Sequence, residues 1–385
     1  MIINTARRLQ GLKEYYFSVK LKEIRAMQAA GKDIINMGVG SPDLAPSVAT
    51  IQALTASASN PHNHGYQPYK GIPSLRKAIA DWYHLTYGVT LDPENEILPL
   101  MGSKEGITHI SLTFLDPGDE VLVPELGYPA YPAVSEMVGA IPKTYPLLEE
   151  NGWQPDFEAL YQMDCSRVKL MWVNYPHMPT GAPATTKLFQ KLVDFASEKK
   201  ILLCHDNPYS LVLNEKPPIS LLSIPGANNI CLELNSMSKS HNMAGWRIGW
   251  VAGAQEYLDE VIKVKSNFDS GMFKGLQDAA VQALQNAAQW HDERNNIYYD
   301  RRVIVFQILD ALHCVYDLHQ EGLFVWAKIP ETYPSVESFV DRLLYEKHIF
   351  FTPGFIFGEK GKRYIRVSLC NDVEVLKKAL TRISS

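Results

Sequence analysis

The 385-residue sequence lacks long apolar runs. No stretch approaches the roughly 20 consecutive apolar residues that a membrane-spanning helix needs. The N-terminal stretch MIINTARRLQGLKEYYF also has no apolar core of the kind found in signal peptides. We therefore expect a cytoplasmic protein with no membrane partner.

Positive charge is in slight deficit, because 37 Lys and Arg residues stand against 42 Asp and Glu residues, for a net charge of −5. Proteins that bind nucleic acids or anionic membranes usually present strongly basic surfaces. The charge balance gives no support for nucleic acid as a partner, and we expect small-molecule ligands.

Cysteines are few, odd in number and scattered, with no CxxC pair and no histidine at zinc-finger spacing. Because this pattern indicates neither disulfides nor a metal site, we predict that the cysteines are reduced thiols. Five histidines also lie without carboxylate or thiolate partners at ligand spacing, so we predict no metal site. The cysteines are Cys165, Cys204, Cys231, Cys314 and Cys370, and the histidines are His62, His64, His177, His205 and His241.

Short apolar stretches rich in Val, Ile, Leu and Trp alternate with longer helical patterns. Continuous apolar strands are typical of a parallel sheet that helices cover on both faces, and their alternation with helices favours an α/β fold. We therefore predict an α/β protein with a mostly parallel sheet. The strand candidates of this sheet are 96–101, 120–125, 168–174, 201–206, 229–234 and 248–253.

Amphipathic spacing predicts helices at 103–115 and 185–200, and a long helical pattern covers 272–313. A chain of this length is expected to form two structural units, and the absence of a Gly/Ser linker predicts that they are interwoven. The predicted division is 1–44 as the N-terminal segment of a smaller α/β domain, 45–275 as the large domain, and 276–385 as an interdomain helix with the C-terminal part of the smaller domain, where 323–330 and 362–369 are strand candidates.

Polar residues follow the apolar stretches, at the point where each predicted strand ends. In an open α/β sheet, ligands bind outside the carboxyl ends of the strands. Five strand ends carry Gly, Ser, Tyr, Asp and Lys, and together they predict one pocket. The five segments are 101–104, 126–129, 174–181, 206–209 and 236–239.

Several of these residues suit a bound phosphate. Gly102 and Ser103 open a predicted helix, whose first N–H groups and positive dipole end attract anions. Ser236, Ser238 and Arg247 would add two hydroxyl donors and a guanidinium.

Other strand-end residues suit covalent chemistry. Asp206, at the end of an apolar strand, needs a cationic partner or several donors to stay ionised. Lys239, if desolvated beside Arg247, would have a lowered pKa and act as an amine nucleophile. With the flat aromatic ring of Tyr128 and the phosphate site, these groups describe a site for pyridoxal 5′-phosphate.

Eight motifs in family order resemble those of class I and II aminotransferases, which are fold-type I pyridoxal-phosphate enzymes. The likeness covers nearly the whole chain. The motifs are GVGSPD at 38–43, GYQPYKGIPSLRKAIADW at 65–82, GSKEGI at 102–107, PELGYPAY at 124–131, MPTG at 178–181, DNPYS at 206–210, SMSKSHNMAGWRIGW at 236–250 and PGFIFGEKGKRYIRVSL at 353–369.

The resemblance implies the roles of the ring-binding residues. Lys239 is expected to bond to the cofactor and later to move the proton at the substrate α-carbon. Asp206 is expected to pair with the pyridine nitrogen, Tyr209 to donate to the ring 3′ oxygen, and Tyr128 to stack on the ring.

The same resemblance implies the residues that hold the phosphate and the substrate. Arg366 would bind the substrate α-carboxylate, with the Gly40 backbone on the other side. Tyr66 would reach the phosphate of a neighbouring subunit, which predicts a homodimer with shared active sites. The expected phosphate residues are Gly102, Ser103, Lys104 through its backbone, Ser236, Ser238 and Arg247.

Met178 departs from the family pattern, which has an asparagine immediately before Pro-Thr-Gly that donates to the ring 3′ oxygen. Asn174 lies four residues too early to replace it. We hypothesise that Tyr209 is the main remaining donor, so that the deprotonated lysine–cofactor linkage is less stabilised and its pKa is higher than in relatives with asparagine.

The function implied is transfer of an amino group from an L-amino acid to a 2-oxo acid by a ping-pong mechanism. Two alternatives stay open: a β-lyase of the cystathionine type, and a noncatalytic pyridoxal-phosphate-binding regulator. A noncatalytic descendant is expected to lose Lys239, Asp206 or Arg366, and all three are present. Acidic, aromatic and diaminopimelate-type amino donors remain open.

Overall fold

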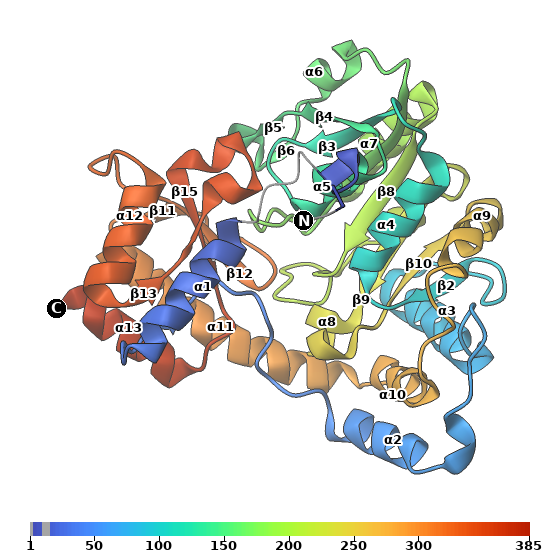
Figure 1. Cartoon of the computed structure of the whole chain (residues 1–385), viewed down its shortest axis with the longest axis horizontal. Helices are drawn as coiled ribbons and strands as arrows, with labels where there is room; N and C mark the ends of the chain where they lie inside the picture. The colour runs from blue at the N-terminus through green and yellow to red at the C-terminus, as the bar shows by residue number, and fades with distance from the viewer. Residues whose placement is uncertain (1–2, 10–15) are drawn as a thin grey trace.

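The protein centres on a seven-stranded sheet and a separate four-stranded sheet, seen in the computed structural model of residues 3–9 and 16–385 (Figure 1). Residues 1–2 and 10–15 belong to the predicted segment 1–44 and to the N-terminal stretch tested for a signal peptide, and they lie outside the described residues. No helix in the described part of the chain is long and apolar enough to cross a membrane.

The larger sheet is mostly parallel, as predicted. Only β10 runs antiparallel to its neighbours, β2 and β9, and the other pairings are parallel. In spatial order the strands are β2 (Ile97–Leu100), β10 (Gly249–Gly253), β9 (Cys231–Ser236), β8 (Leu202–Asn207), β7 (Val168–Val173), β3 (Glu120–Pro124) and β4 (Ile141–Tyr145).

Helices cover both faces of this sheet because alternate strand residues pack into two different apolar clusters. In β7, Leu170 and Trp172 join one cluster while Met171 and Val173 join the other. One face carries α4 (Ser103–Phe114), α5 (Ala130–Met137) and α9 (Gln255–Lys265), and the other carries α3 (Pro73–Tyr87), α7 (Thr186–Lys199) and α10 (Lys274–Leu284).

The smaller sheet is antiparallel and combines with segments from the start of the chain. Strand β1 (Ile35–Asn36) pairs with β13 (Ile349–Phe350), so residues more than 300 positions apart lie side by side. The four strands are β11 (Val315–Tyr316), β12 (Phe324–Lys328), β15 (Tyr364–Ser368) and β14 (Thr352–Pro353), and the surrounding helices are α1 (Tyr16–Ala29), α11 (Ala288–Ala311), α12 (Val336–Arg342) and α13 (Val373–Ser384). The domain boundaries at 44 and 275 stay a prediction.

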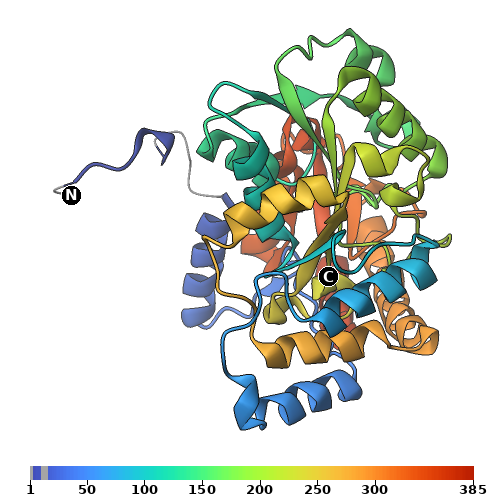
Figure 2. The same cartoon turned by 90° about the vertical axis from the view of Figure 1, so that its right-hand side faces the viewer.

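Two predicted elements differ from the structure. The helical pattern at 272–313 is divided into α10 and α11, because α10 packs against α2 (Val48–Ala58) and α3 beside the larger sheet, whereas α11 packs on α13 (Figures 1 and 2). No Gly or Pro marks the break at 285–287, so tertiary packing decides it. The strand predicted at 229–234 lies two residues later, as β9, and Ser236 is its last residue.

The remaining elements are short. They are β5 (Leu147–Leu148), β6 (Gln154–Pro155), α6 (Phe157–Gln162), α8 (Met237–Ser240), the 3₁₀ turns η1 (Arg7–Leu9), η2 (Pro61–Asn63), η3 (Glu149–Asn151), η4 (Leu221–Ser223), η5 (Ala227–Asn229), η6 (Ala244–Trp246), η8 (Gly354–Phe357) and η9 (Glu359–Arg363), and the π-turn η7 (Leu343–Lys347).

Candidate active site

A cavity of about 380 Å³ lies where residues from the ends of β7, β8 and β9 meet residues of the smaller sheet. The structure thus brings together most of the side chains that the sequence analysis selected. The predicted site residues that line the cavity are Gly40, Ser103, Lys104, Tyr128, Met178, Asp206, Tyr209, Ser236, Ser238, Lys239, Arg247 and Arg366.

Two predicted residues are not in this lining. Gly102 lies directly behind it: its φ is +87°, and a Cβ atom there would be 2.0 Å from Nη2 of Arg247. Glycine is therefore needed for both the backbone conformation and the close approach of the guanidinium. Tyr66 is 92% exposed and borders a separate surface hollow with His64 and Phe273, away from this chain's own cavity.

Lys239 lies on the single-turn helix α8, with its Nζ 2.5 Å from the carbonyl oxygen of Gly40. Burial lowers the pKa of Lys239 to about 8; Cys370 acts against this shift, and the positive charges of Arg366 and Arg247 add to it. A larger fraction of this amine is therefore neutral and nucleophilic near neutral pH than for an exposed lysine.

Asp206 is a buried carboxylate near the end of β8. Its Oδ2 accepts a hydrogen bond from the Tyr131 hydroxyl at 3.0 Å, while its buried Oδ1 has no partner among the described residues. Burial raises the pKa of Asp206 to about 6, against the hydrogen bond from Tyr131, the charge of His205 and a hydrogen bond from Ser103. A cationic N–H donor at Oδ1 would satisfy this oxygen and favour the ionised form.

The predicted phosphate residues form one connected group. The Ser236 hydroxyl caps α8 by accepting from the Ser238 N–H, and it donates to the Ser238 hydroxyl at 2.9 Å. Arg247 donates to the Ser238 hydroxyl at 3.3 Å, and the N-terminus of α4 begins at Ser103 on the same side. This set offers hydroxyl, guanidinium and helix N-terminal donors to one anion.

Arg366 is a buried guanidinium between two aromatic rings. Its Cζ lies 3.8 Å from the ring centroid of Phe324 and 4.7 Å from that of Phe357. It donates to the carbonyl oxygen of Gly38, but it has no carboxylate within ion-pair distance in the described part of the chain, and its buried Nε is unpaired. Burial lowers the pKa of Arg366 to about 10, which shows that the charged guanidinium is disfavoured by its loss of water. A bound carboxylate would offset this desolvation cost.

Met178 takes the place of the expected asparagine and contacts Arg366 instead. Its Sδ lies 3.3 Å from Nη1 of Arg366. Asn174 also lines the cavity, but its amide donates to the Asp206 carbonyl oxygen at 2.6 Å and accepts from the Met178 N–H at 2.8 Å. The role of Asn174 is thus to hold two backbone segments together, consistent with the register assigned from the sequence.

Some residues that support the predicted ones were not predicted from the sequence. Tyr131 stood in a quoted motif without a role, and its ring stacks on Trp172 with centroids 5.3 Å apart and planes 1° apart. Phe357 likewise stood without a role in the quoted motif 353–369, which also contains Arg366, whereas Phe324 comes from β12. Position in a quoted motif could have indicated Tyr131 and Phe357; the contact of Phe324 with Arg366 needed the tertiary structure.

The charge of the cavity suits an anionic ligand. Four cationic side chains line it, Lys104, Lys239, Arg247 and Arg366, against the single carboxylate of Asp206. Together with the unpaired Oδ1 and the phosphate donors, this arrangement matches the groups of pyridoxal 5′-phosphate with a substrate carboxylate. Tyr128 and Tyr209 border the same space as neutral aromatics, since burial raises the pKa of each.

One cluster of possible metal ligands occurs among the described residues. Glu105, His109 and Asp269 place ligand atoms within 4.8 Å of one another. Lys265 already lies 2.9 Å from the Asp269 carboxylate, and its ammonium would repel a metal cation. The absence of a metal requirement stays a prediction.

Comparison with known proteins supports the same assignment. The family model for aminotransferase class I and II matches residues 32–383. The chain is 40% identical over 380 residues to an LL-diaminopimelate aminotransferase of Aquifex aeolicus, covering 98% of each chain.

Solved structures are also similar. Substrate-bound BacF from Bacillus subtilis has a TM-score of 0.93 at 37% identity, covering 100% of this chain and 98% of that one. The aspartate aminotransferase of Thermus thermophilus with maleate has a TM-score of 0.92 at 26% identity, covering 99% of each chain.

The first prediction concerns Met178. In Met178→Asn, a new amide donor would stabilise the deprotonated lysine–cofactor linkage, so the pKa read from the visible absorption of the bound cofactor should fall by about one pH unit, since a hydrogen bond to a charged group contributes about 1.5–3 kcal/mol. Met178→Leu, which adds no donor, should leave this pKa unchanged. An equal pKa in wild type and Met178→Asn would contradict the hypothesis.

The second prediction concerns Lys239. Because only the neutral amine attacks an aldehyde, the rate at which the apoprotein captures pyridoxal 5′-phosphate should rise with pH and reach half its maximum at about pH 8. Arg366→Met removes a nearby positive charge and should move this midpoint upward, whereas Lys104→Met, at an exposed cation, should not. A wild-type midpoint near the ordinary lysine pKa would show that the amine is not desolvated.

Proposed function

The chain belongs to the aminotransferase class I and II family, and from this premise we propose that it transfers the amino group of LL-diaminopimelate to a 2-oxo acid. The predicted activity, a pyridoxal phosphate-dependent transaminase that uses an L-amino acid and a 2-oxo acid, is confirmed. Similarity over nearly the whole chain to relatives named as aminotransferases favours transfer over the cystathionine-type β-lyase and over the noncatalytic regulator.

The observation that supports LL-diaminopimelate as the donor is the similarity of this chain to enzymes named for that substrate. Relatives called LL-diaminopimelate aminotransferase share 36–41% identity with this chain over nearly their whole length. LL-diaminopimelate carries a second carboxylate at its far end. With Arg366 assigned to the α-carboxylate and Arg247 to the phosphate, the exposed Lys104 ammonium is the cation of the cavity left to meet that second carboxylate.

We assign the ring-binding roles as the resemblance implies. Asp206 pairs with the pyridine nitrogen through its unpaired Oδ1, Tyr209 donates to the ring 3′ oxygen, and Tyr128 lies against the ring. When bound, pyridoxal phosphate supplies a ring that withdraws electrons from the substrate α-carbon. Lys239 would hold the cofactor covalently and, once the substrate amine has replaced it in that bond, its free amine would move the proton at the substrate α-carbon.

The remaining site residues position the reactants. The Arg366 guanidinium binds the α-carboxylate, and the rings of Phe324 and Phe357 restrict where that guanidinium lies. At Gly40, a Cβ atom would lie 2.1 Å from the Phe324 ring, so glycine lets the backbone pass this close to the ring that packs on Arg366. The phosphate is held by Gly102, Ser103, the Lys104 backbone, Ser236, Ser238 and Arg247.

We also propose a homodimer in the cytoplasm. Tyr66 is 92% exposed and does not line the cavity of its own chain, as expected for a side chain that completes the phosphate site of a second subunit. The five cysteines are free, which agrees with a reducing compartment.

A panel of amino donors tests the proposed substrate. With 2-oxoglutarate as acceptor, we expect kcat/KM for LL-diaminopimelate to exceed that for L-aspartate and L-phenylalanine by at least about tenfold, which corresponds to about 1.4 kcal/mol. The proposal is contradicted if another donor is preferred, or if the products are pyruvate and ammonia.

A matched variant separates the donor from the general activity. Lys104→Met should lower kcat/KM for LL-diaminopimelate about tenfold or more, because it removes the charge that meets the second carboxylate. The same variant should leave L-2-aminohexanoate, which lacks that carboxylate, within about twofold. Equal losses for both substrates would place Lys104 outside substrate recognition.

A further inference from the structure

His205 and Glu233 form a fully buried polar pair directly behind the strand end that carries Asp206. Both side chains are 0% exposed, and Nδ1 of His205 lies 2.8 Å from Oε2 of Glu233. The two residues face each other across β8 and β9, in register. Burying two ionisable groups this deeply is costly unless every polar atom is paired.

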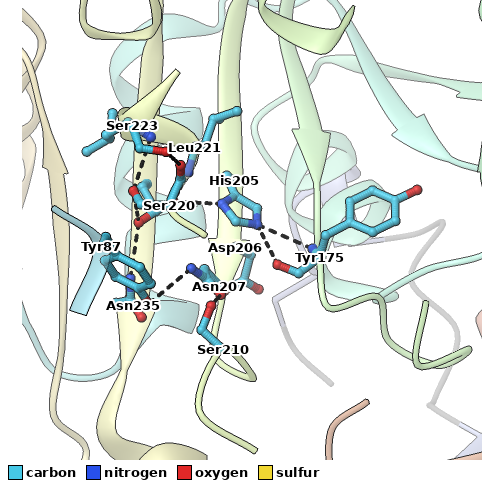
Figure 3. A network of polar contacts seen from close by, with 12 residues as sticks. Tyr87, Tyr175, His205, Asp206, Asn207, Ser210, Ser220, Leu221, Ser223 and Asn235 are labelled. Atoms are coloured by element: carbon cyan, nitrogen blue, oxygen red, sulfur yellow. Dashed lines mark hydrogen bonds and ion pairs between the residues drawn. The ribbon is translucent and has the colours of Figure 1, made fainter. Parts of the chain in front are cut away.

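The hydrogen bonds of His205 indicate which protons its ring carries. Figure 3 shows contacts at both ring nitrogens. Nδ1 faces the Glu233 carboxylate, and Nε2 lies 2.8 Å from the carbonyl oxygen of Tyr175. Neither oxygen is a donor when Glu233 is ionised, so both nitrogens must donate, and the ring is then an imidazolium. The Tyr175 N–H also points at Nε2, and this contact would require Nε2 to accept instead of donate. At 3.3 Å it is longer than the 2.8 Å contact with the carbonyl oxygen, so donation by Nε2 is favoured.

Glu233 is surrounded by donors that favour its ionised form. Its Oε1 accepts from the Tyr83 hydroxyl at 3.0 Å and from the Ser220 hydroxyl at 2.8 Å. Its Oε2 accepts from the Leu221 N–H at 2.8 Å in addition to His205. A carboxylate with this many donors stays charged in a buried site, and it then stabilises a positive His205.

His205 acts on the site without touching it. Successive strand residues point to opposite faces, and the His205 ring packs on Phe189 of α7, with centroids 5.0 Å apart, whereas Asp206 contacts Tyr131 of α5. The His205 charge nevertheless lowers the pKa of Asp206. A unit charge one residue away in a buried strand is screened little by solvent.

We propose that the His205–Glu233 ion pair is a positioning device for catalysis, which keeps Asp206 ionised so that Asp206 holds the pyridine nitrogen of the cofactor protonated. This inference rests on the role of Asp206 in the proposed function. His205 is a positioning residue and not a catalytic one, because it acts only through Asp206.

Among the described residues, His205 is the one group whose charge lowers the pKa of Asp206. Tyr128, Tyr131 and Tyr209 also lie near Asp206, but burial raises the pKa of each, so all three stay neutral. If His205 were neutral, Asp206 would lose the positive charge on its own strand and would bind a proton more readily. A neutral Asp206 cannot stabilise a cationic pyridine ring.

Glu233→Gln tests the role of the His205–Glu233 ion pair, because it removes the charge with little change in side-chain shape. The amide can still accept from Tyr83 and Ser220 and can donate to Nδ1 of a neutral His205, so both charges vanish and only the hydrogen bond from the Leu221 N–H is lost. In the holoenzyme loaded with ¹⁵N-labelled pyridoxal phosphate, the pH midpoint at which the pyridine nitrogen loses its proton, read from its ¹⁵N NMR shift, should fall by about one unit. That shift is a tenfold change in proton affinity, and pyridoxal phosphate should dissociate correspondingly more readily.

Three further variants make each outcome informative. Ser220→Ala removes one donor to Glu233 without changing a charge and should leave the ¹⁵N midpoint at the wild-type value. His205→Gln leaves the Glu233 charge uncompensated and should lower the ¹⁵N midpoint at least as much as Glu233→Gln does. If Glu233→Gln does not fold, His205→Gln tests the ion pair in its place. Asp206→Asn should lower the midpoint most.

The outcomes separate this inference from the proposed function. If Asp206→Asn leaves the nitrogen as protonated as in wild type, the proposed role of Asp206 is wrong. If Asp206→Asn lowers the midpoint but folded Glu233→Gln and His205→Gln do not, the ion-pair inference alone is overturned. An equal fall in Ser220→Ala and Glu233→Gln would also overturn it, since the effect would then be one of packing.

Discussion

The cost of burying charge governs this site. Arg366 and Asp206 are buried and Lys239 is half-buried, and burial shifts the pKa of each in the direction that favours its neutral form. In this chain the cations of the cavity outnumber its single carboxylate, so the site holds unbalanced positive charge until anionic groups enter. A phosphate and a substrate carboxylate supply those groups, and the same desolvation that makes the empty site costly makes binding selective.

Placing these charges together requires both ends of the chain. Gly38, from the N-terminal part, accepts hydrogen bonds from Arg366 of β15 and from Thr352 of β14. Asp43 makes a two-pronged ion pair with the buried Arg301 of α11, at 2.7 and 2.8 Å. These contacts connect the start of the chain to the smaller sheet, and so they place the Gly40 backbone beside Lys239 of the larger sheet.

Much of this arrangement follows from the sequence because the strands carry a strong local signal. Apolar strands with polar ends predicted the sheet and most of the cavity lining, including Asp206 and Lys239. The division between α10 and α11 could not be predicted, because packing against two different layers imposes it on a sequence with no helix breaker. The contact of Arg366 with Phe324 joins two different strands of the smaller sheet, and the role proposed for the exposed Tyr66 depends on a second subunit, which one chain's sequence does not show.

The central claim is that the desolvated amine of Lys239 is the group that bonds to pyridoxal phosphate. Reduction of the holoenzyme with borohydride, followed by peptide mapping by mass spectrometry, tests it directly. We predict a single phosphopyridoxyl label, on Lys239 in the peptide that contains SMSKSHNMAGWR. A label on another lysine of the cavity, such as Lys104, or no label on a holoenzyme that shows the visible absorption of the bound cofactor, would contradict the account.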